Sequence, residues 1–151
     1  MRQSWDDYFL AIAKLMATRS TCIRAQHGAV IVRDKTILST GFNGAPRGLQ
    51  HCDAVGLCYR DQNGILPGTQ YERCKSAHAE QNAIAQAARV GIAIEGSTMY
   101  VTDMPCGICA KLIVNAGIQK VVFLRTERYL ERSSAEVFVE AGIEMQEVIE
   151  S

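Results

Sequence analysis

Strand-like and helix-like segments alternate through the second half of this chain, and this order constrains its fold more than any other feature. Apolar periodicity and terminal glycines predict helices over 76–90, 106–116 and 133–141. Short β-prone runs predict strands over 97–101, 120–124 and 143–149. Because a helix joins each of these strands to the next, we expect them to pair in parallel.

The first half of the chain adds a helix and a hairpin. Ser4 is placed as a helix cap, and apolar side chains follow at helical spacing from Trp5 to Met16. Strands over 29–32 and 36–40 flank a polar turn, which is typical of an antiparallel hairpin. Together the elements predict an α/β fold, a three-layer α/β/α sandwich. Its five-stranded mixed sheet has a first strand antiparallel to its neighbours.

Length and composition narrow the class of protein. The 151 residues fit one domain over 1–151, with a long loop insertion at about 43–75 that lacks clear periodicity. Sixteen basic residues balance sixteen acidic residues, which argues against an extended nucleic-acid surface. No apolar run approaches the roughly 20 residues of a membrane span, and we expect a cytoplasmic protein. In a reducing compartment, six cysteines favour metal binding over disulfides.

The motif that carries chemistry is His78-Ala-Glu80 followed by Pro105-Cys106-Gly-Ile-Cys109. One histidine and two cysteines are the protein ligands of a catalytic zinc that keeps its fourth position open. Each half alone would be a weak signal, because C-x-x-C also occurs in structural zinc sites and redox proteins. In this order the two halves match the pattern of zinc-dependent nucleobase deaminases. A purely structural zinc, or a redox pair beside an unrelated histidine, is the alternative.

These residue types suit hydrolysis at neutral pH. His78 and Cys106 fall near predicted helix N-termini, where the partial positive charge favours thiolate over thiol. A zinc ion at these ligands lowers the pKa of its bound water toward ~7. Glu80 is placed to take that proton, deliver it to a ring nitrogen and then protonate the departing amine.

The chain resembles the deoxycytidylate (dCMP) deaminases of the zinc-dependent cytidine deaminase superfamily over about residues 4–149. The resemblance rests on these stretches: Gly28-Ala-Val-Ile-Val, Thr40-Gly-Phe-Asn-Gly-Ala-Pro-Arg-Gly48, His51-Cys52-Asp53, His78-Ala-Glu-Gln-Asn-Ala-Ile84, Met99-Tyr-Val-Thr102 and Pro105-Cys106-Gly-Ile-Cys109. One departure is His27, where the family usually has a small apolar residue.

The resemblance implies hydrolysis of dCMP to dUMP and ammonia, which supplies dUMP for thymidylate synthesis. It also implies that Asn43 binds the sugar hydroxyl and that Glu80 is the proton shuttle. Family members form ring-like homo-oligomers, often hexamers, and many respond to dCTP and dTTP. Mg²⁺ is the expected companion of such a triphosphate effector.

The substrate phosphate and the effector need further contacts. We expect Arg24 and Tyr129 at the phosphate, because the corresponding places in related sequences lie near the pocket mouth. The alternative is a surface arginine and a packed tyrosine. Gly44 and Arg47, in the Asn-Gly-Ala-Pro-Arg-Gly stretch, are the candidates for an effector triphosphate.

Four cysteines remain after the catalytic pair: Cys22, Cys52, Cys58 and Cys74. A loop without regular structure gains stability from a metal, and zinc favours four soft ligands in a closed structural site. Some related deaminases carry such a second zinc with mixed Cys and His ligands, so His51 could replace one cysteine. The alternative is four unligated thiols.

Two other functions stay open from the sequence. One is a deaminase of another cytosine nucleotide or nucleoside, of tRNA or of a pteridine-like base; the neutral net charge argues against tRNA. The other is a non-catalytic accessory protein with this fold. The intact Glu80 argues against a silent protein, because a binding module needs no proton shuttle.

Overall fold

Five strands form one mixed sheet in the order β2-β1-β3-β4-β5. The structure is a computed structural model that describes residues 1–126 and 133–150. Strand β1 pairs antiparallel with both β2 and β3, while β3, β4 and β5 run parallel. The predicted mixed sheet, with an antiparallel first strand and parallel last strands, is therefore confirmed. The strands are β1 Gly28–Arg33, β2 Thr36–Phe42, β3 Thr98–Val101, β4 Lys120–Leu124 and β5 Glu144–Val148.

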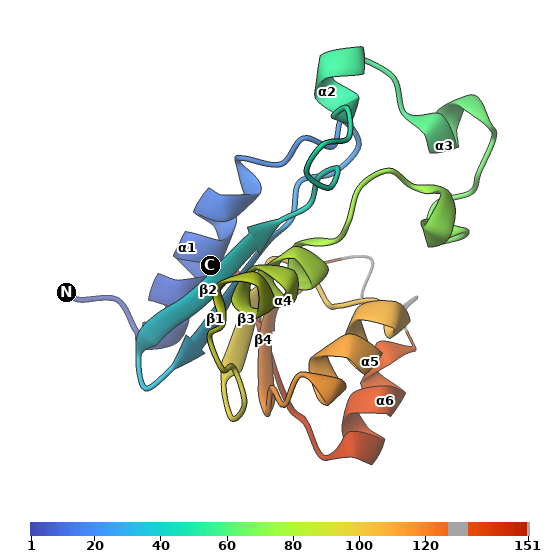
Figure 1. Cartoon of the computed structure of the whole chain (residues 1–151). Helices are drawn as coiled ribbons and strands as arrows, with labels where there is room; N and C mark the ends of the chain where they lie inside the picture. Colours follow the sequence, from blue (N-terminus) through green and yellow to red (C-terminus); the bar gives the residue numbers. More distant parts are fainter. Residues whose placement is uncertain (127–132, 151) are drawn as a thin grey trace.

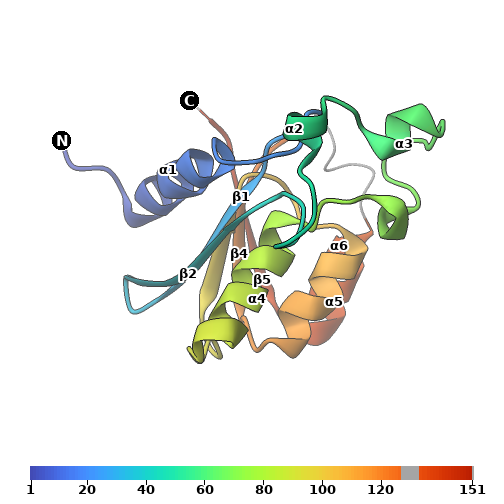
Figure 2. The same ribbon diagram turned by 45° about the horizontal axis from the view of Figure 1, so that its top comes forward.

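Helices cover both faces of this sheet. Helix α1 (Trp5–Ala17) lies on one face, and α4 (Ala79–Val90), α5 (Gly107–Asn115) and α6 (Ser134–Ala141) lie on the other (Figures 1 and 2). Each side of the sheet has its own cluster of buried apolar side chains. The predicted three-layer sandwich is thus confirmed. No helix in the described ranges is long and apolar enough to cross a bilayer.

The burial of each strand follows from its place in the sheet. Strand β1 is an interior strand with helices on both faces, and its first five residues are all buried. A continuous apolar run such as Ala29-Val-Ile-Val32 suits a strand of this kind. Strand β5 is an edge strand whose sequence, Glu-Met-Gln-Glu-Val, leaves most of its residues only partly buried.

Helix α4 begins later than its sequence suggests, and this places the site. The sequence predicts Ser76 as the cap, but the cap is His78, whose N–H donates to Gln81 Oε1 at 2.7 Å. The reason is an isolated bridge in which Gly44 and Ala77 exchange backbone hydrogen bonds of 3.1 and 2.9 Å. That pairing keeps the backbone extended through Ala77, so the helix cannot start earlier.

The segment between β2 and α4 is not structureless. It contains three short helical turns, which pack at one end of the sandwich beyond the sheet (Figure 1). Each is about one turn long, too short to give an apolar period in the sequence. They are α2 Cys52–Val55, α3 Tyr59–Gln62 and the 3₁₀ helix η1 Tyr71–Arg73.

The contact between β2 and α4 depends on Gly41. A Cβ at this position would lie 2.4 Å from both Ala79 O and Ala83 N. Gly41→Ala should therefore push α4 off the sheet and lower the free energy of unfolding by about 1–3 kcal/mol or more. Urea unfolding measures this change.

Gly48→Ala is the control for the Gly41 variant. Gly48 has a φ of 86°, and a Cβ added there would meet nothing within 4 Å, so only left-handed strain of about 1 kcal/mol is expected. A smaller loss for Gly41→Ala than for Gly48→Ala would contradict the close packing of α4 on β2.

Candidate active site

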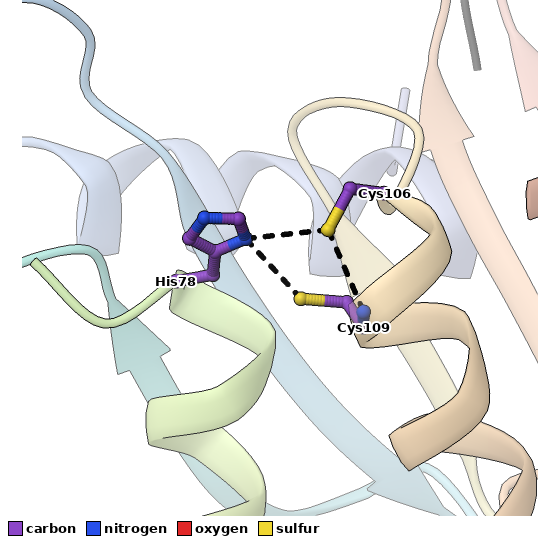
Figure 3. A group of neighbouring side chains, drawn as sticks. All are labelled: His78, Cys106 and Cys109. Atoms are coloured by element: carbon purple, nitrogen blue, oxygen red, sulfur yellow. Dashed lines mark hydrogen bonds between the residues drawn. The ribbon is translucent and has the colours of Figure 1, made fainter. Parts of the chain in front are cut away.

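Two helix starts bring the predicted metal ligands together. His78 caps α4, Cys106 caps α5, and Cys109 lies in the first turn of α5. The chain runs from α4 through β3 into α5, and the two helices pack on the same face of the sheet. In Figure 3 the imidazole of His78 and the two thiol groups point toward one another.

The spacing of these groups fits a zinc ion. His78 Nδ1 lies 3.5 Å from Cys106 Sγ and 3.3 Å from Cys109 Sγ. Tetrahedral zinc, with bonds of about 2.0 Å to nitrogen and 2.3 Å to sulfur, holds such atoms about 3.5 Å apart. Within the described part of the chain, this is the one group of three or more such side chains whose ligand atoms all lie within 4.8 Å. The donor set and its geometry therefore suit zinc.

The two thiols interact strongly with each other. Their mutual hydrogen bond, aided by His78, lowers the pKa of Cys106 to about 4. The same hydrogen bond raises the pKa of Cys109, and burial of the thiol is the second cause of that rise. The backbone N–H of Cys109 also donates to Cys106 Sγ at 3.5 Å. One member of the pair is thus a ready thiolate ligand, at a helix N-terminus that favours negative charge.

Glu80 lies beside the ligands on α4. Its residue surface is only 6% exposed. Burial raises the pKa of this carboxyl above its ordinary value, although the neighbouring His78 and a hydrogen bond with Cys109 act in the opposite direction. A carboxyl with a raised pKa next to a metal site can hold and release a proton near neutral pH.

A cavity of about 490 Å³ opens beside this group. Its size falls within the roughly 300–1,000 Å³ of small-molecule sites. The lining includes His78, Glu80 and Cys106, and also the polar side chains of Asn43 and Arg60. Two of the three metal ligands, His78 and Cys106, therefore face a space large enough for a small substrate.

Asn43 and Arg24, both predicted to contact substrate, line this cavity. Asn43 Oδ1 accepts from the N–H of His27 at 2.9 Å, and its Nδ2 donates to Ala25 O at 2.8 Å. Arg24 Nη1 lies 3.3 Å from Asp61 Oδ1. The amide of Asn43 thus fixes the strand ends around the cavity.

The structure does not place the other predicted contacts, Tyr129, Gly44 and Arg47, at the cavity. Tyr129 falls outside the described residues. The described lining of the cavity includes neither Gly44 nor Arg47. Arg47 is exposed and its Nη2 donates to Gln86 Oε1 at 3.3 Å. The structure therefore does not bring the expected effector residues to the cavity.

The four remaining cysteines all line the same cavity, and each of them is a free thiol. Burial raises the pKa of Cys52, and the charges of Cys22, Cys58 and Cys74 raise it further. Their sulfur atoms do not reach the mutual spacing of the His78 group. His51 lies outside the described lining, and its Nδ1 contacts Thr21 Oγ1 at 3.0 Å.

No motif or apolar pattern in the sequence marks two of the side chains near the site, Tyr71 and Arg60, as functional residues. The ring of Tyr71 packs edge-on against His78, with 4.8 Å between ring centroids and 85° between planes. Arg60 also lines the cavity and is only 8% exposed. Both come from the segment without periodicity, where a sequence pattern cannot separate buried from solvated residues.

Comparison with known proteins assigns the family. The profile of the cytidine and deoxycytidylate deaminase zinc-binding region matches residues 3–125. The chain belongs to this family of zinc-dependent deaminases, and the His78, Cys106 and Cys109 group lies within the matched range.

Individual relatives agree with this assignment. The chain is 42% identical over 127 residues to the deoxycytidylate deaminase of Mycobacterium phage D29, covering 81% of this chain and 95% of the relative. It is 38% identical over 147 residues to ComE operon protein 2 of Bacillus subtilis, and the match covers 97% of this chain and 72% of that protein. The structure is similar to that of the dCMP deaminase from the cyanophage S-TIM5 in complex with dCMP and dUMP. The TM-score is 0.79 and the identity 28%, over 98% of this chain and 99% of that one.

Proposed function

We propose that this protein hydrolyses dCMP to dUMP and ammonia and so supplies dUMP for thymidylate synthesis. The observation that carries the proposal is the convergence of His78, Cys106 and Cys109 at zinc spacing beside the buried Glu80. Relatives named deoxycytidylate deaminase, including the phage enzyme above, support dCMP as the substrate. The buried carboxyl supports a catalyst over an accessory protein, because an ionisable group costs free energy to bury.

The proposed mechanism divides the work among these side chains. His78, Cys106 and Cys109 would hold a zinc ion, which would lower the pKa of a water molecule toward ~7 and so ready it for addition to C4 of cytosine. Glu80 accepts the proton that the water loses and delivers it to ring N3. A further proton transfer through Glu80 converts the amino group into ammonia as the C4–N bond breaks. One water molecule is consumed, and its oxygen atom becomes O4 of the uracil base.

The source of that oxygen tests hydrolysis. With dCMP in H₂¹⁸O, mass spectrometry should find one ¹⁸O in each dUMP formed and one ammonia released per dUMP. Release of ammonia without ¹⁸O in the product would rule out direct attack by water and contradict the mechanism.

We propose substrate contacts from Asn43, Arg24 and Tyr129. The place of Asn43 in the cavity wall supports contact with the sugar hydroxyl. Arg24 also lines the cavity, and its pairing with Asp61 would have to loosen for it to meet a phosphate. Tyr129 stays a proposal from the family resemblance alone.

Regulation and assembly are proposals of the same kind. We infer activation by dCTP and inhibition by dTTP, with Mg²⁺ at the triphosphate and with Gly44 and Arg47 as contacts. The exposed position of Arg47 leaves its guanidinium accessible to such a ligand. A homohexamer and a cytoplasmic location complete the proposal, and the free thiols suit a reducing compartment.

A second, structural zinc at Cys22, Cys52, Cys58 and Cys74 is also proposed, with His51 as the alternative ligand. All four cysteines line the cavity, and the charges of Cys22, Cys58 and Cys74 raise the pKa of Cys52. Ordering a loop costs on the order of 1–2 kcal/mol of backbone entropy per residue, and metal binding can offset that cost. The sulfur atoms must draw closer than they lie here to complete the site.

Zinc content tests the second site. The purified protein should hold about two zinc ions per chain, and Cys52→Ser should hold about one and melt at least ~5 °C lower. Plasma emission after dialysis against zinc-free buffer measures the metal. His51→Asn separates the two ligand sets, because zinc content falls only if His51 is a ligand. A content of one zinc ion per unmutated chain would contradict the second site and mean that the four cysteines are unligated thiols.

A further inference from the structure

Arg60 is a buried cation in the wall of the active-site cavity. The residue is 8% exposed and lies in α3, within the segment between β2 and α4. Its Nη2 donates to the carbonyl oxygens of Leu66 and Thr69, at 3.0 and 2.8 Å. Its Nε is buried and has no hydrogen-bond partner among the described residues. A guanidinium carries five N–H donors, so much of its hydrogen-bonding capacity is unused.

The charge of Arg60 has no carboxylate partner in the part of the chain that the structure describes. Among the described residues, no carboxylate forms an ion pair with it, whereas the neighbouring Arg24 is paired with Asp61. Burial of an ionised group costs several kcal/mol unless an opposite charge and hydrogen bonds compensate it. An arginine in this state next to an open cavity is suited to receive an anion from that cavity.

The position of Arg60 relative to the metal ligands fits one nucleotide. Its guanidinium carbon lies 5.4 Å from the centroid of the Tyr71 ring, and that ring lies 4.8 Å from the centroid of His78. The guanidinium is thus about 10 Å at most from the His78 ring. A nucleotide whose base lies at His78 is therefore long enough for its phosphate to approach the guanidinium.

We propose that Arg60 binds the 5′-phosphate of the substrate and makes the enzyme select a nucleoside monophosphate over a nucleoside. This inference rests on the proposed deamination of dCMP, and it adds a cation from the loop segment to the contact proposed for Arg24. Stacking on Tyr71 and the bonds to Leu66 and Thr69 hold the guanidinium in place before the substrate arrives.

The test compares a nucleotide with its nucleoside. In Arg60→Gln, kcat/KM for dCMP should fall about 10- to 100-fold, the effect of losing a charge-assisted hydrogen bond. For deoxycytidine, which has no phosphate, kcat/KM should change by about threefold at most. Arg60→Lys keeps a positive charge and should recover part of the preference for dCMP.

Arg73→Gln is the matched control. Arg73 lies in the same segment and stacks on Tyr59 as Arg60 stacks on Tyr71, but it is exposed and does not line the cavity. Its substitution should leave the ratio of the two kcat/KM values unchanged. Equal losses for dCMP and deoxycytidine in Arg60→Gln would indicate a purely structural role and overturn the proposal. A variant altered only in its response to added dCTP would overturn it as well.

Binding of dUMP separates this proposal from the proposed function. By calorimetry, Arg60→Gln and Arg60→Lys should both bind dUMP more weakly than the unmutated protein, while deoxyuridine binding should not change. If the unmutated protein deaminates no dCMP but binds dUMP through Arg60, the proposed function fails and the phosphate site stands. If dCMP is deaminated and neither variant weakens dUMP binding, the phosphate site fails alone.

Discussion

Glu80→Gln is expected to keep the fold and the catalytic zinc while lowering kcat for dCMP by about 10²- to 10⁴-fold, the usual contribution of a positioned general acid–base. The amide has nearly the shape of the carboxyl but cannot accept the proton that water loses. Glu80 is not one of the three residues at ligand spacing, so its substitution leaves the metal donors unchanged. Steady-state ammonia release and zinc analysis on the same sample measure both expectations.

Glu140→Gln is the control for Glu80→Gln. Glu140 is an exposed carboxylate on α6, and its neutralisation should leave kcat unchanged. A Glu80→Gln enzyme that keeps its zinc and a nearly normal rate would mean that another group moves the proton.

Cys109→Ala should lower activity at least as much as Glu80→Gln, but by removing a metal ligand. Removing one of three protein ligands should cost the catalytic zinc, and activity should fall by more than ~10³-fold because the metal supplies the nucleophile. Zinc content should drop by about one ion per chain. Near-native circular dichroism is expected, because Cys109 is a small buried residue that alanine nearly matches in volume.

Cys52→Ser provides the contrast for Cys109→Ala. It should retain the catalytic zinc and lose only the proposed structural ion. Full zinc content in Cys109→Ala would contradict the assignment of this thiol as a ligand.

The fold was predictable where burial imposes a pattern on the sequence. Strand β4, Lys120–Leu124, has the predicted bounds, because its last four residues are an apolar run buried inside the sheet. The predicted cap of α4, Ser76, is wrong by two residues, because the bridge between Gly44 and Ala77 joins positions far apart in sequence. Short turns such as α3 escape prediction, because they are stabilised by contacts of the segment as a whole and not by periodic apolar residues.

The site was predictable to the extent that its chemistry fixes residue type and spacing. The joint pattern of His78, Glu80, Cys106 and Cys109 identified the metal group, and the structure brings its ligand atoms together. Arg60 carries no such signal. A lone arginine in a polar segment is usually solvated, and only the tertiary structure shows that it is buried and faces a cavity. The hydrogen bonds that hold Asn43 are equally invisible in the sequence.

This member of the deaminase family acts on dCMP. The most direct measurement is the deamination rate of the zinc-loaded protein with dCMP, CMP, deoxycytidine and dCTP, followed by absorbance under identical conditions. We predict the highest kcat/KM for dCMP, with deoxycytidine lower because it lacks the phosphate. A higher kcat/KM for deoxycytidine or CMP, or no ammonia from any of the four compounds, would contradict the account.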